Sequence, residues 1–244
     1  MKNYLQRRLP ILSYYMDFDK KLSLPACMGM FQDIANDHGE KLGVDRWSLL
    51  KSSNAFWVIT KVKMKIKRFP ELDQKVDVKT WTIDNTAVKF DRDCTISIAG
   101  EELVAIKSEW VALDATTRRI RPAKTIKFPF DMKNIKKRAI SEKYSAFSTI
   151  VDSNDFVYER KVVSTDIDVN NHVNNCFYSR FVLDCFSVDF LRNHQLTDYE
   201  IHFINESTEG ETIAFYKKET AKNVFYVEAR VGEKVITKTQ LKFQ

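Results

Sequence analysis

The stretch SLPACMGMFQDIANDHGEKLG, residues 23–43, decides the fold, because it predicts a long helix directly before a series of strands. Ser23 is a favourable N-terminal cap, Pro25 suits the first turn, and Gly43 is a typical C-terminal stop. Apolar residues recur between them at helical spacing, at Leu24, Met28, Phe31, Ile34, Ala35 and Leu42. The stretch therefore predicts an amphipathic helix with one apolar face to bury.

Four strand-like runs follow this helix, at residues 55–67, 75–83, 87–98 and 102–113. In the first run Val62, Met64 and Ile66 alternate with lysines, which is typical of a strand with one buried and one solvated face. A helix of about 18 residues is about 27 Å long and can lie along such a sheet. The first half therefore predicts one helix packed on an antiparallel sheet.

The second half of the chain repeats this order of elements. It has a strand-like run at 157–164, a turn-rich stretch at 166–175 and a helical pattern at about 174–192. Four more strand-like runs close the chain, at residues 199–204, 212–218, 224–231 and 234–242. Residues 11–18 are the candidate leading strand of the first half, so that each half has the order strand, helix, four strands.

The repeated order predicts an α+β protein of two tandem helix-on-antiparallel-sheet repeats, the layout called a double hot dog fold. The alternative is an α+β protein whose halves are similar by chance. We expect an N-terminal hot dog domain at residues 1–125 and a C-terminal one, with the motif described below, at residues 155–244. Residues 126–154, which hold several basic residues without a sustained period, are expected to connect them.

The composition is that of a folded protein made and kept inside the cell. Apolar residues make up 44% and charged residues 30% of the chain, which argues against disorder. The first twenty residues lack the apolar run of a signal peptide, and no stretch is apolar over the roughly 20 residues that span a bilayer. We therefore expect a cytoplasmic protein whose four cysteines are free thiols and form no zinc site.

The net charge of +6 permits an acidic partner, such as nucleic acid, anionic lipid or an acidic carrier protein, but does not choose among them. Basic residues gather at 61–67 and again at Arg118, Arg119, Arg121 and Lys124. The lysines at 61–67 are also explained as the solvated face of a strand. No nucleic-acid recognition motif accompanies the basic residues, so we expect no nucleic-acid partner.

The segment DIDVNNHVNNCFY, residues 166–178, has the polar residues that a hydrolytic site needs. Asp168, Asn170 and His172 stand at alternate positions, so that in an extended chain their side chains point the same way. The helix that follows begins with backbone N–H groups that can stabilise an oxyanion. A thioester requires only a polarised carbonyl and an activated water or side-chain nucleophile, because its thiolate leaves readily. Glu206, after the next strand, is a second candidate carboxylate.

The sequence resembles the acyl-ACP thioesterases, the plant and bacterial family that releases fatty acids from acyl carrier protein (ACP). The likeness is closest at residues 168–175, DVNNHVNN, with Tyr178 following, and it extends to Trp110–Arg121 and to FWVIT at residues 56–60. The resemblance implies hydrolysis of fatty acyl-ACP, which terminates chain elongation in fatty acid biosynthesis. It also implies an acidic acyl carrier protein as partner, and neither a cofactor nor a metal.

The resemblance implies a catalytic role for Asp168, Asn170, His172 and Glu206. The next family position is a cysteine in plant enzymes, but it is Ser207 in this sequence. This difference disfavours a cysteine nucleophile. We therefore favour attack by water with either Asp168 or Glu206 as the base, and Ser207 is the second choice as a nucleophile.

Other polar residues near the motif have structural explanations. Asn171, Asn174 and Asn175 suit a turn and a helix cap. The three histidines outside the motif are expected to be structural hydrogen-bonding residues. The chemical part of the motif is therefore narrower than the segment that carries the resemblance.

Several functions remain compatible with this motif. The nearest is hydrolysis of acyl-CoA, followed by hydration or dehydration of an acyl thioester and by carrier binding without catalysis. In each case the acyl tail would lie in an apolar tunnel between helix and sheet, for which Met28, Phe31 and Trp57 are candidates that are equally explained as core residues. Two hot dog units in one chain can pair with each other, so we expect a monomer or a homodimer.

Overall fold

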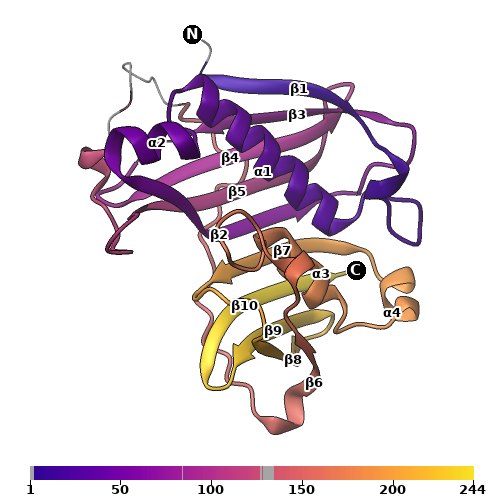
Figure 1. Cartoon of the computed structure of the whole chain (residues 1–244). Helices are drawn as coiled ribbons and strands as arrows, with labels where there is room; N and C mark the ends of the chain where they lie inside the picture. Colours follow the sequence, from indigo (N-terminus) through magenta and orange to yellow (C-terminus); the bar gives the residue numbers. More distant parts are fainter. Residues whose placement is uncertain (1–2, 84, 127, 129–134) are drawn as a thin grey trace. The chain divides into compact units, whose positions relative to one another are not determined.

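The structure is a computed structural model that describes residues 3–83, 85–126, 128 and 135–244 (Figure 1). It divides into two compact units. The first comprises Met1–Leu22 and Gly29–Glu142, and the second comprises Ser23–Met28 and Lys143–Gln244. Each unit is built around antiparallel strands.

The first unit has five antiparallel strands in the order β1-β3-β4-β5-β2. Their bounds are β1 Tyr4–Pro10, β2 Ala55–Ile66, β3 Lys75–Thr82, β4 Lys89–Ile98 and β5 Glu101–Asp114. Two helices lie between β1 and β2 in the chain, α1 Leu24–Lys41 and α2 Arg46–Ser53. Helix α1 crosses the face of β3, β4 and β5 (Figure 1), where the ring of Phe31 lies 6.3 Å from that of Trp110 on β5.

The second unit has five antiparallel strands in the order β7-β10-β9-β8-β6. Their bounds are β6 Phe156–Lys161, β7 Leu196–Phe203, β8 Thr212–Ala221, β9 Val224–Val231 and β10 Lys234–Phe243. Its helices are α3 Asn175–Leu183 and α4 Val188–Asn193. Helix α3 packs on these strands, because the rings of Tyr178 and Phe181 lie 6.0 Å from Phe203 and 6.2 Å from Phe215.

The two units repeat one arrangement. In each, the leading strand pairs with the first strand of a consecutive antiparallel series of three, and the strand after the helices pairs with the last strand of that series. The predicted α+β fold, a double hot dog of two helix-on-sheet repeats, is therefore confirmed.

The local signals that predicted α1 and β2 act as expected. The Ser23 hydroxyl accepts the N–H of Ala26 at 3.3 Å, which satisfies one of the free donors at the start of α1. Gly43 has a φ of 66°, the left-handed conformation that favours glycine after a helix. Val62 and Met64 are fully buried in β2, while the lysines between them are half-buried. Both elements are thus confirmed.

The predicted leading strand at residues 11–18 is wrong, because the leading strand is β1. Residues 11–18 contain a 3-10 helix, Ser13–Tyr15. β1 is an edge strand that pairs with β3 over its full length, and most of its side chains are exposed or half-buried. An edge strand of this kind lacks the alternation that identifies a half-buried strand, and Pro10 at its end is compatible with an edge position.

The single helix predicted at residues 174–192 is also wrong, because α3 and α4 are separate helices. Ser187 lies between them in extended conformation, and its hydroxyl accepts the N–H of Phe190 at 3.1 Å as the N-cap of α4. Phe186 precedes the break and packs its ring 5.1 Å from that of Phe225. Apolar residues continue at helical spacing through the break, so the periodicity hides it.

Helix α2 is absent from the sequence-based prediction. Its signals are local: the Asp45 carboxylate accepts the N–H groups of Trp47 and Ser48 at 2.9 and 3.2 Å, and Asn54 ends the helix with a φ of 47°. Only Leu49 of this helix is buried. A helix with so narrow an apolar face gives almost no periodic signal.

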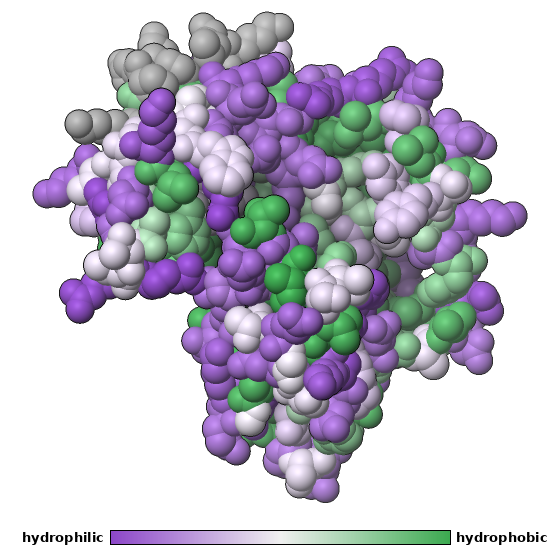
Figure 2. Space-filling model, in the orientation of Figure 1, coloured by the Kyte–Doolittle hydropathy of each residue, from purple (hydrophilic) through white to green (hydrophobic). Residues whose placement is uncertain are grey.

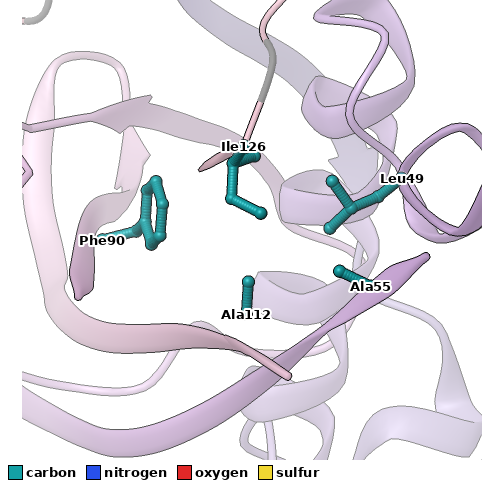
Figure 3. Packing of buried hydrophobic residues seen from close by; sticks show 5 residues of the cluster. All are labelled: Leu49, Ala55, Phe90, Ala112 and Ile126. Atoms are coloured by element: carbon teal, nitrogen blue, oxygen red, sulfur yellow. The ribbon is translucent and has the colours of Figure 1, made fainter. Parts of the chain in front are cut away.

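A hydrophobic cluster lies between α2 and the strands of the first unit (Figure 3). Its buried members are Leu49, Ala55, Phe90, Ala112 and Ile126. Ile126 belongs to the segment predicted to connect the domains, so the beginning of that segment contributes to the core of the first unit.

Later parts of the segment predicted as the connection also pack on the strands. The Asp93 carboxylate of β4 accepts the N–H of Ala139 at 2.7 Å, and burial raises the pKa of Asp93 to about 6. In the second unit, Glu200 of β7 accepts the N–H of Ser145 at 2.6 Å. Buried carboxylates therefore hold this segment by its backbone.

Candidate active site

The motif segment forms a closed loop, the catalytic-motif loop (residues 167–173), just before α3. Its first and last residues form an isolated antiparallel bridge. The N–H of Asp168 donates to the carbonyl of His172 at 2.9 Å, and the N–H of Asn171 donates to the carbonyl of Asp168 at 3.0 Å. Asn171 has a φ of 64°, which asparagine tolerates better than most residues. Asn171 is thus a turn residue, as predicted.

Asp168 and Asn170 are held together in this loop. The Asp168 carboxylate accepts the backbone N–H of Asn170 at 2.7 Å and its side-chain Nδ2–H at 3.2 Å. These bonds direct the other amide atom, Oδ1, away from Asp168. Oδ1 of Asn170 is buried, and among the described residues no donor lies within hydrogen-bond distance of it. Asn170 therefore holds a buried acceptor that no described donor satisfies, which is unusual for a buried polar atom.

His172 and Glu206 form the second contact of the site. Nε2 of His172 lies 3.0 Å from Oε2 of Glu206, with side chains that are 22% and 40% exposed. Glu206 stands just after β7. Its carbonyl accepts a hydrogen bond from Lys234 Nζ at 2.8 Å, which ties it to the start of β10. The pair is accessible, as groups that act on a substrate must be.

Ser207 differs from its neighbour Glu206 because it is fully buried. Its hydroxyl shares a hydrogen bond with the hydroxyl of Tyr178 on α3, and its carbonyl accepts the N–H of Val173 at 3.0 Å. Burial raises the pKa of Tyr178 above its usual value, so the phenol stays protonated. Ser207 therefore links the end of the catalytic-motif loop to α3 and to the residue beside Glu206.

The start of α3 is capped by the motif itself. Oδ1 of Asn174 accepts the N–H of Cys176 at 2.9 Å, so Asn174 is the N-cap, as predicted. The helix begins at Asn175. The helix terminus directly follows the loop that holds the polar side chains, so the positive end of its dipole favours negative charge near them.

Sequence reasoning assigned no role to Asp166 or to the hydroxyl of Tyr178. Asp166 is 1% exposed and lies at the base of the loop, where its carbonyl accepts the N–H of Asn174 at 2.9 Å. Asp166 is acidic and only two positions before Asp168, and that repeat in the motif is the one signal that could have identified it.

The three residues predicted to line an acyl tunnel are in hydrophobic surroundings. Met28 and Phe31 are fully buried. Trp57 is partly buried, donates its indole N–H to the carbonyl of Val44 at 2.7 Å, and packs 4.7 Å from the ring of Phe90. Contact of these residues with an acyl chain stays a prediction.

The three other histidines bond within the protein. His38 is buried, and its Nδ1 lies 2.9 Å from the Arg92 guanidinium; burial, with the charge of Arg92, lowers the pKa of His38 to about 3. His194 contacts the carbonyl of Phe190 at 2.9 Å. His202 contacts Glu200 at 2.8 Å.

The described residues have three further features, which concern metal binding, membrane spans and the surface. These residues contain no group of three or more His, Cys, Asp or Glu side chains that could hold a metal ion. No helix among them is both long and apolar enough to cross a membrane. On the face shown in Figure 2, hydrophilic residues surround several smaller hydrophobic patches, a distribution that is usual for protein surfaces.

A double hot dog fold with a carboxylate, an amide and an imidazole beside a helix start narrows the class of protein, and comparison with known sequences identifies the family. The family model of the acyl-ACP thioesterase N-terminal domain matches residues 2–125, and the model of the C-terminal domain matches residues 151–244. The chain belongs to the acyl-ACP thioesterase family.

Individual relatives are distant. The chain is 22% identical to the chloroplastic acyl-acyl-carrier-protein hydrolase FATB1 of Cuphea viscosissima, over 80% of this chain and 49% of that protein. It is 24% identical to the chloroplastic palmitoyl-acyl carrier protein thioesterase of Arabidopsis thaliana, over 82% of this chain and 52% of that protein. The chain thus spans about half the length of the curated relatives it matches.

Solved structures share the fold over the whole chain. The acyl-ACP thioesterase of Bacteroides thetaiotaomicron VPI-5482 has a TM-score of 0.90 at 21% identity, covering 99% of this chain and 98% of that one. The 12:0-ACP thioesterase of Umbellularia californica has a TM-score of 0.85 at 17% identity, covering 100% and 98%. At these identities the likeness establishes the fold.

Proposed function

We propose that the protein hydrolyses fatty acyl-ACP thioesters and releases free fatty acid, the step that ends chain elongation in fatty acid biosynthesis. The observation that carries the proposal is the contact of His172 with Glu206 at 3.0 Å, next to the fixed Asp168–Asn170 pair, in a chain of this family. The curated relatives are named as hydrolases or thioesterases of acyl carrier protein conjugates, which supports the same substrate class.

The nucleophile in this proposal is a water molecule. It would lie beside the accessible His172–Glu206 pair, which removes its proton as it attacks the thioester carbonyl, and Asn170 would help to orient it. The positive end of the α3 dipole would stabilise the oxyanion. When the tetrahedral intermediate collapses, the carbon–sulfur bond breaks, and the same pair returns the proton to the leaving thiolate.

Glu206 is a better candidate for the base than Asp168. Both oxygens of the Asp168 carboxylate already accept hydrogen bonds from Asn170, which suits an orienting role. The Glu206 side chain is 40% exposed and contacts an imidazole that can share the proton. We therefore assign proton transfer to the pair of Glu206 and His172.

Ser207 has a positioning role in this mechanism. Its hydroxyl is buried and bonded to Tyr178, so a thioester carbonyl would need to displace that bond before Ser207 could attack it. A water mechanism needs no such displacement. We propose that Ser207, through its bonds to Tyr178 and Val173, fixes the backbone next to Glu206 relative to the catalytic-motif loop.

Thiol release from purified protein tests the proposal. Acyl-ACP and acyl-CoA of several chain lengths are compared for free thiol formed per unit time. We expect release from acyl-ACP with the higher kcat/KM. Absence of release from either substrate contradicts thioesterase activity, and a clear preference for CoA contradicts the choice of carrier.

The proposal also includes the setting in which the enzyme acts. We propose a cytoplasmic monomer or homodimer whose partner is an acidic acyl carrier protein. Four free, buried cysteines are compatible with a reducing compartment. A net charge of +6 favours encounter with an acidic carrier, and such steering weakens as salt rises. Light scattering in solution and the salt dependence of kcat/KM on acyl-ACP test these two points.

A further inference from the structure

Asp166 stands two residues before Asp168 and has a buried carboxylate with three donors. Oδ2 accepts Nη2 of Arg160 at 2.7 Å and the N–H of Val163 at 3.1 Å. Oδ1 accepts Nη2 of Arg180 at 3.4 Å. The side chain of Asp166 is 2% exposed. A buried carboxylate with two guanidinium partners is strongly bound to its surroundings, because removing one partner leaves a buried charge uncompensated.

The backbone of Asp166 closes the base of the catalytic-motif loop. Its N–H donates to the carbonyl of Val163 at 2.9 Å, and its carbonyl accepts the N–H of Asn174, also at 2.9 Å. Asn174 in turn caps α3. Asp166 therefore fixes both the entry to the loop and the start of the helix that follows it.

The two arginines connect this residue to the elements on either side. Arg160 belongs to β6, and its guanidinium lies 3.7 Å from the ring centre of the buried Phe181 on α3. Arg180 belongs to α3 and is half-exposed. The cluster of Asp166 with Arg160 and Arg180, here called the Asp166 triad, thus joins strand, loop and helix.

The corresponding loop of the first unit lacks the triad. Leu9, Tyr15 and Gly29 occupy the positions of the three triad residues, as counted from the 3-10 helix and the start of the long helix in each half. That loop nevertheless has the same bridge between its ends. The turn can therefore form without the triad, so forming the turn does not explain why the second loop has one.

We propose that Asp166, held by Arg160 and Arg180, is a positioning residue that sets His172 against Glu206. The inference rests on the proposed thioesterase function. His172 has no support from a neighbouring side chain within its own loop, because the loop's internal side-chain bonds join Asp168 and Asn170. Its placement relative to Glu206 therefore depends on how firmly the base of the loop is held.

The variant Asp166→Asn tests the proposal with little change of volume. The amide oxygen of the new side chain can still accept a hydrogen bond. The site, however, loses the negative charge that pairs with Arg160 and Arg180. We expect kcat on acyl-ACP to fall about ten- to a hundredfold, the size of effect that a small misplacement of a catalytic group produces. KM should change less than about twofold, because substrate binding does not use the triad.

A matched control separates positioning from general destabilisation. Glu228 on β9 is 2% exposed, shares a hydrogen bond with Tyr226, and lies 2.6 Å from Arg230. The variant Glu228→Gln therefore also removes a buried, arginine-paired charge from the second unit. We expect both variants to lower the melting temperature, but only Asp166→Asn to lower kcat. A kcat that is unchanged in Asp166→Asn, or that falls equally in both, overturns the proposal.

Two further measurements keep the test decisive. Amide hydrogen exchange at Asp168, Asn171 and Asn174 should be faster in Asp166→Asn than in Glu228→Gln, and equal rates overturn the proposal even if the wild-type protein has no thioesterase activity. If Asp166→Asn does not fold, Arg180→Gln replaces it, since Arg180 is half-exposed. We expect a smaller fall of kcat in the same direction, and a wild-type kcat in Arg180→Gln overturns the proposal.

Discussion

The loop at residues 16–22 and the catalytic-motif loop have the same backbone but different chemistry. In the first, the N–H of Asp17 donates to the carbonyl of Lys21 at 2.8 Å, and the N–H of Lys20 donates to that of Asp17 at 3.2 Å. The corresponding bonds of the catalytic-motif loop are 2.9 and 3.0 Å long. Lys20 also has a positive φ, 60°, as Asn171 has at the corresponding position of the second loop. The hot dog repeat therefore supplies the turn whether or not it is used.

Asp17 corresponds to Asp168, but the side chains differ at the other three positions to which we assign a part in hydrolysis. The N–H of Leu22 donates to the carbonyl of Pro70 at 2.7 Å, as Val173 does to Ser207, so the residues before them correspond. Asp19, Lys21 and Phe69 thus take the places of Asn170, His172 and Glu206. One loop has an imidazole in contact with a carboxylate, whereas the corresponding positions of the other are a lysine and a phenylalanine. The fold therefore provides the turn in both repeats, and a few substitutions separate the loop at residues 16–22 from the loop that we propose to be catalytic.

Removing the imidazole is the change with the largest expected effect. In His172→Ala, Glu206 loses its partner, and proton transfer from water loses about 10²- to 10⁴-fold in rate. We expect kcat on acyl-ACP to fall by that factor while the melting temperature changes little, because His172 is partly exposed.

The variant Glu206→Gln sharpens this result, because it keeps a hydrogen-bond partner for His172 but removes the base. It should lower kcat to a similar level, and the double variant should be no worse than either single one if the two groups act as a unit. Additive losses in the double variant would show that His172 and Glu206 act separately.

The two repeats also differ in what lies between helix and sheet. Arg92 and Phe225 stand at the same distance from the C-terminal ends of their strands, β4 and β9. Phe225 belongs to an aromatic cluster with Phe186, whereas Arg92 lies 2.9 Å from Nδ1 of the buried His38. Burial and the Arg92 charge lower the pKa of His38 to about 3, so folding keeps this imidazole neutral.

Acid should therefore weaken the protein through His38. The unfolded chain protonates this histidine near pH 6.5, and the folded protein does not, so stability is present above pH 6.5 and is lost as the pH falls below it. We expect His38→Gln to remove a loss of about 2 kcal/mol between pH 6.5 and 5, since each pH unit contributes about 1.4 kcal/mol. Urea unfolding at both pH values measures it. Equal pH dependence of the two proteins would contradict a neutral His38.

Sequence periodicity predicted those parts of the fold in which each side chain faces either core or solvent. The alternation in β2 is such a signal, and the caps of α1 added a local signal for where that helix begins and ends. It failed where exposure is nearly uniform, as in β1, or where apolar spacing runs through a break, as at Ser187. Periodicity describes the spacing of apolar residues, and at these two places that spacing does not mark where an element begins or ends.

The candidate site was predicted as a set of residues, and the structure adds how they are paired. Alternate spacing in the motif indicated that Asp168, Asn170 and His172 act together, but the loop is a turn in which Asp168 bonds to Asn170 and His172 contacts Glu206. A hydrogen bond between residues far apart in the chain, such as that of Tyr178 with Ser207, leaves no periodic signal.

That hydrogen bond predicts a smaller effect. In Tyr178→Phe the buried Ser207 hydroxyl loses its partner, so the free energy of unfolding should fall by about 1 kcal/mol. The kcat should fall a few-fold, because Glu206 is next to Ser207 in the chain and shifts when Ser207 is held less firmly. Tyr199→Phe is a matched control, since Tyr199 is also fully buried but its hydroxyl has no hydrogen-bond partner among the described residues. Urea unfolding and kcat should change less in the control. A greater loss in Tyr199→Phe would remove the role assigned to the Tyr178–Ser207 bond.

The smallest effect is expected at Lys21, the counterpart of His172. If the loop at residues 16–22 is only structural, its side chain at this position has no part in the reaction, and its backbone bond to Asp17 does not depend on the side chain. Lys21→Ala should therefore leave kcat on acyl-ACP within about twofold of wild type, the change expected of a surface substitution far from any special feature. A kcat that falls tenfold or more at an unchanged melting temperature would mean that the first loop takes part in catalysis, and the division between a structural and a catalytic loop would be wrong. A change confined to KM that disappears at high salt would instead give Lys21 a part in attracting the acidic carrier, because screening removes such attraction while leaving the chemistry unchanged.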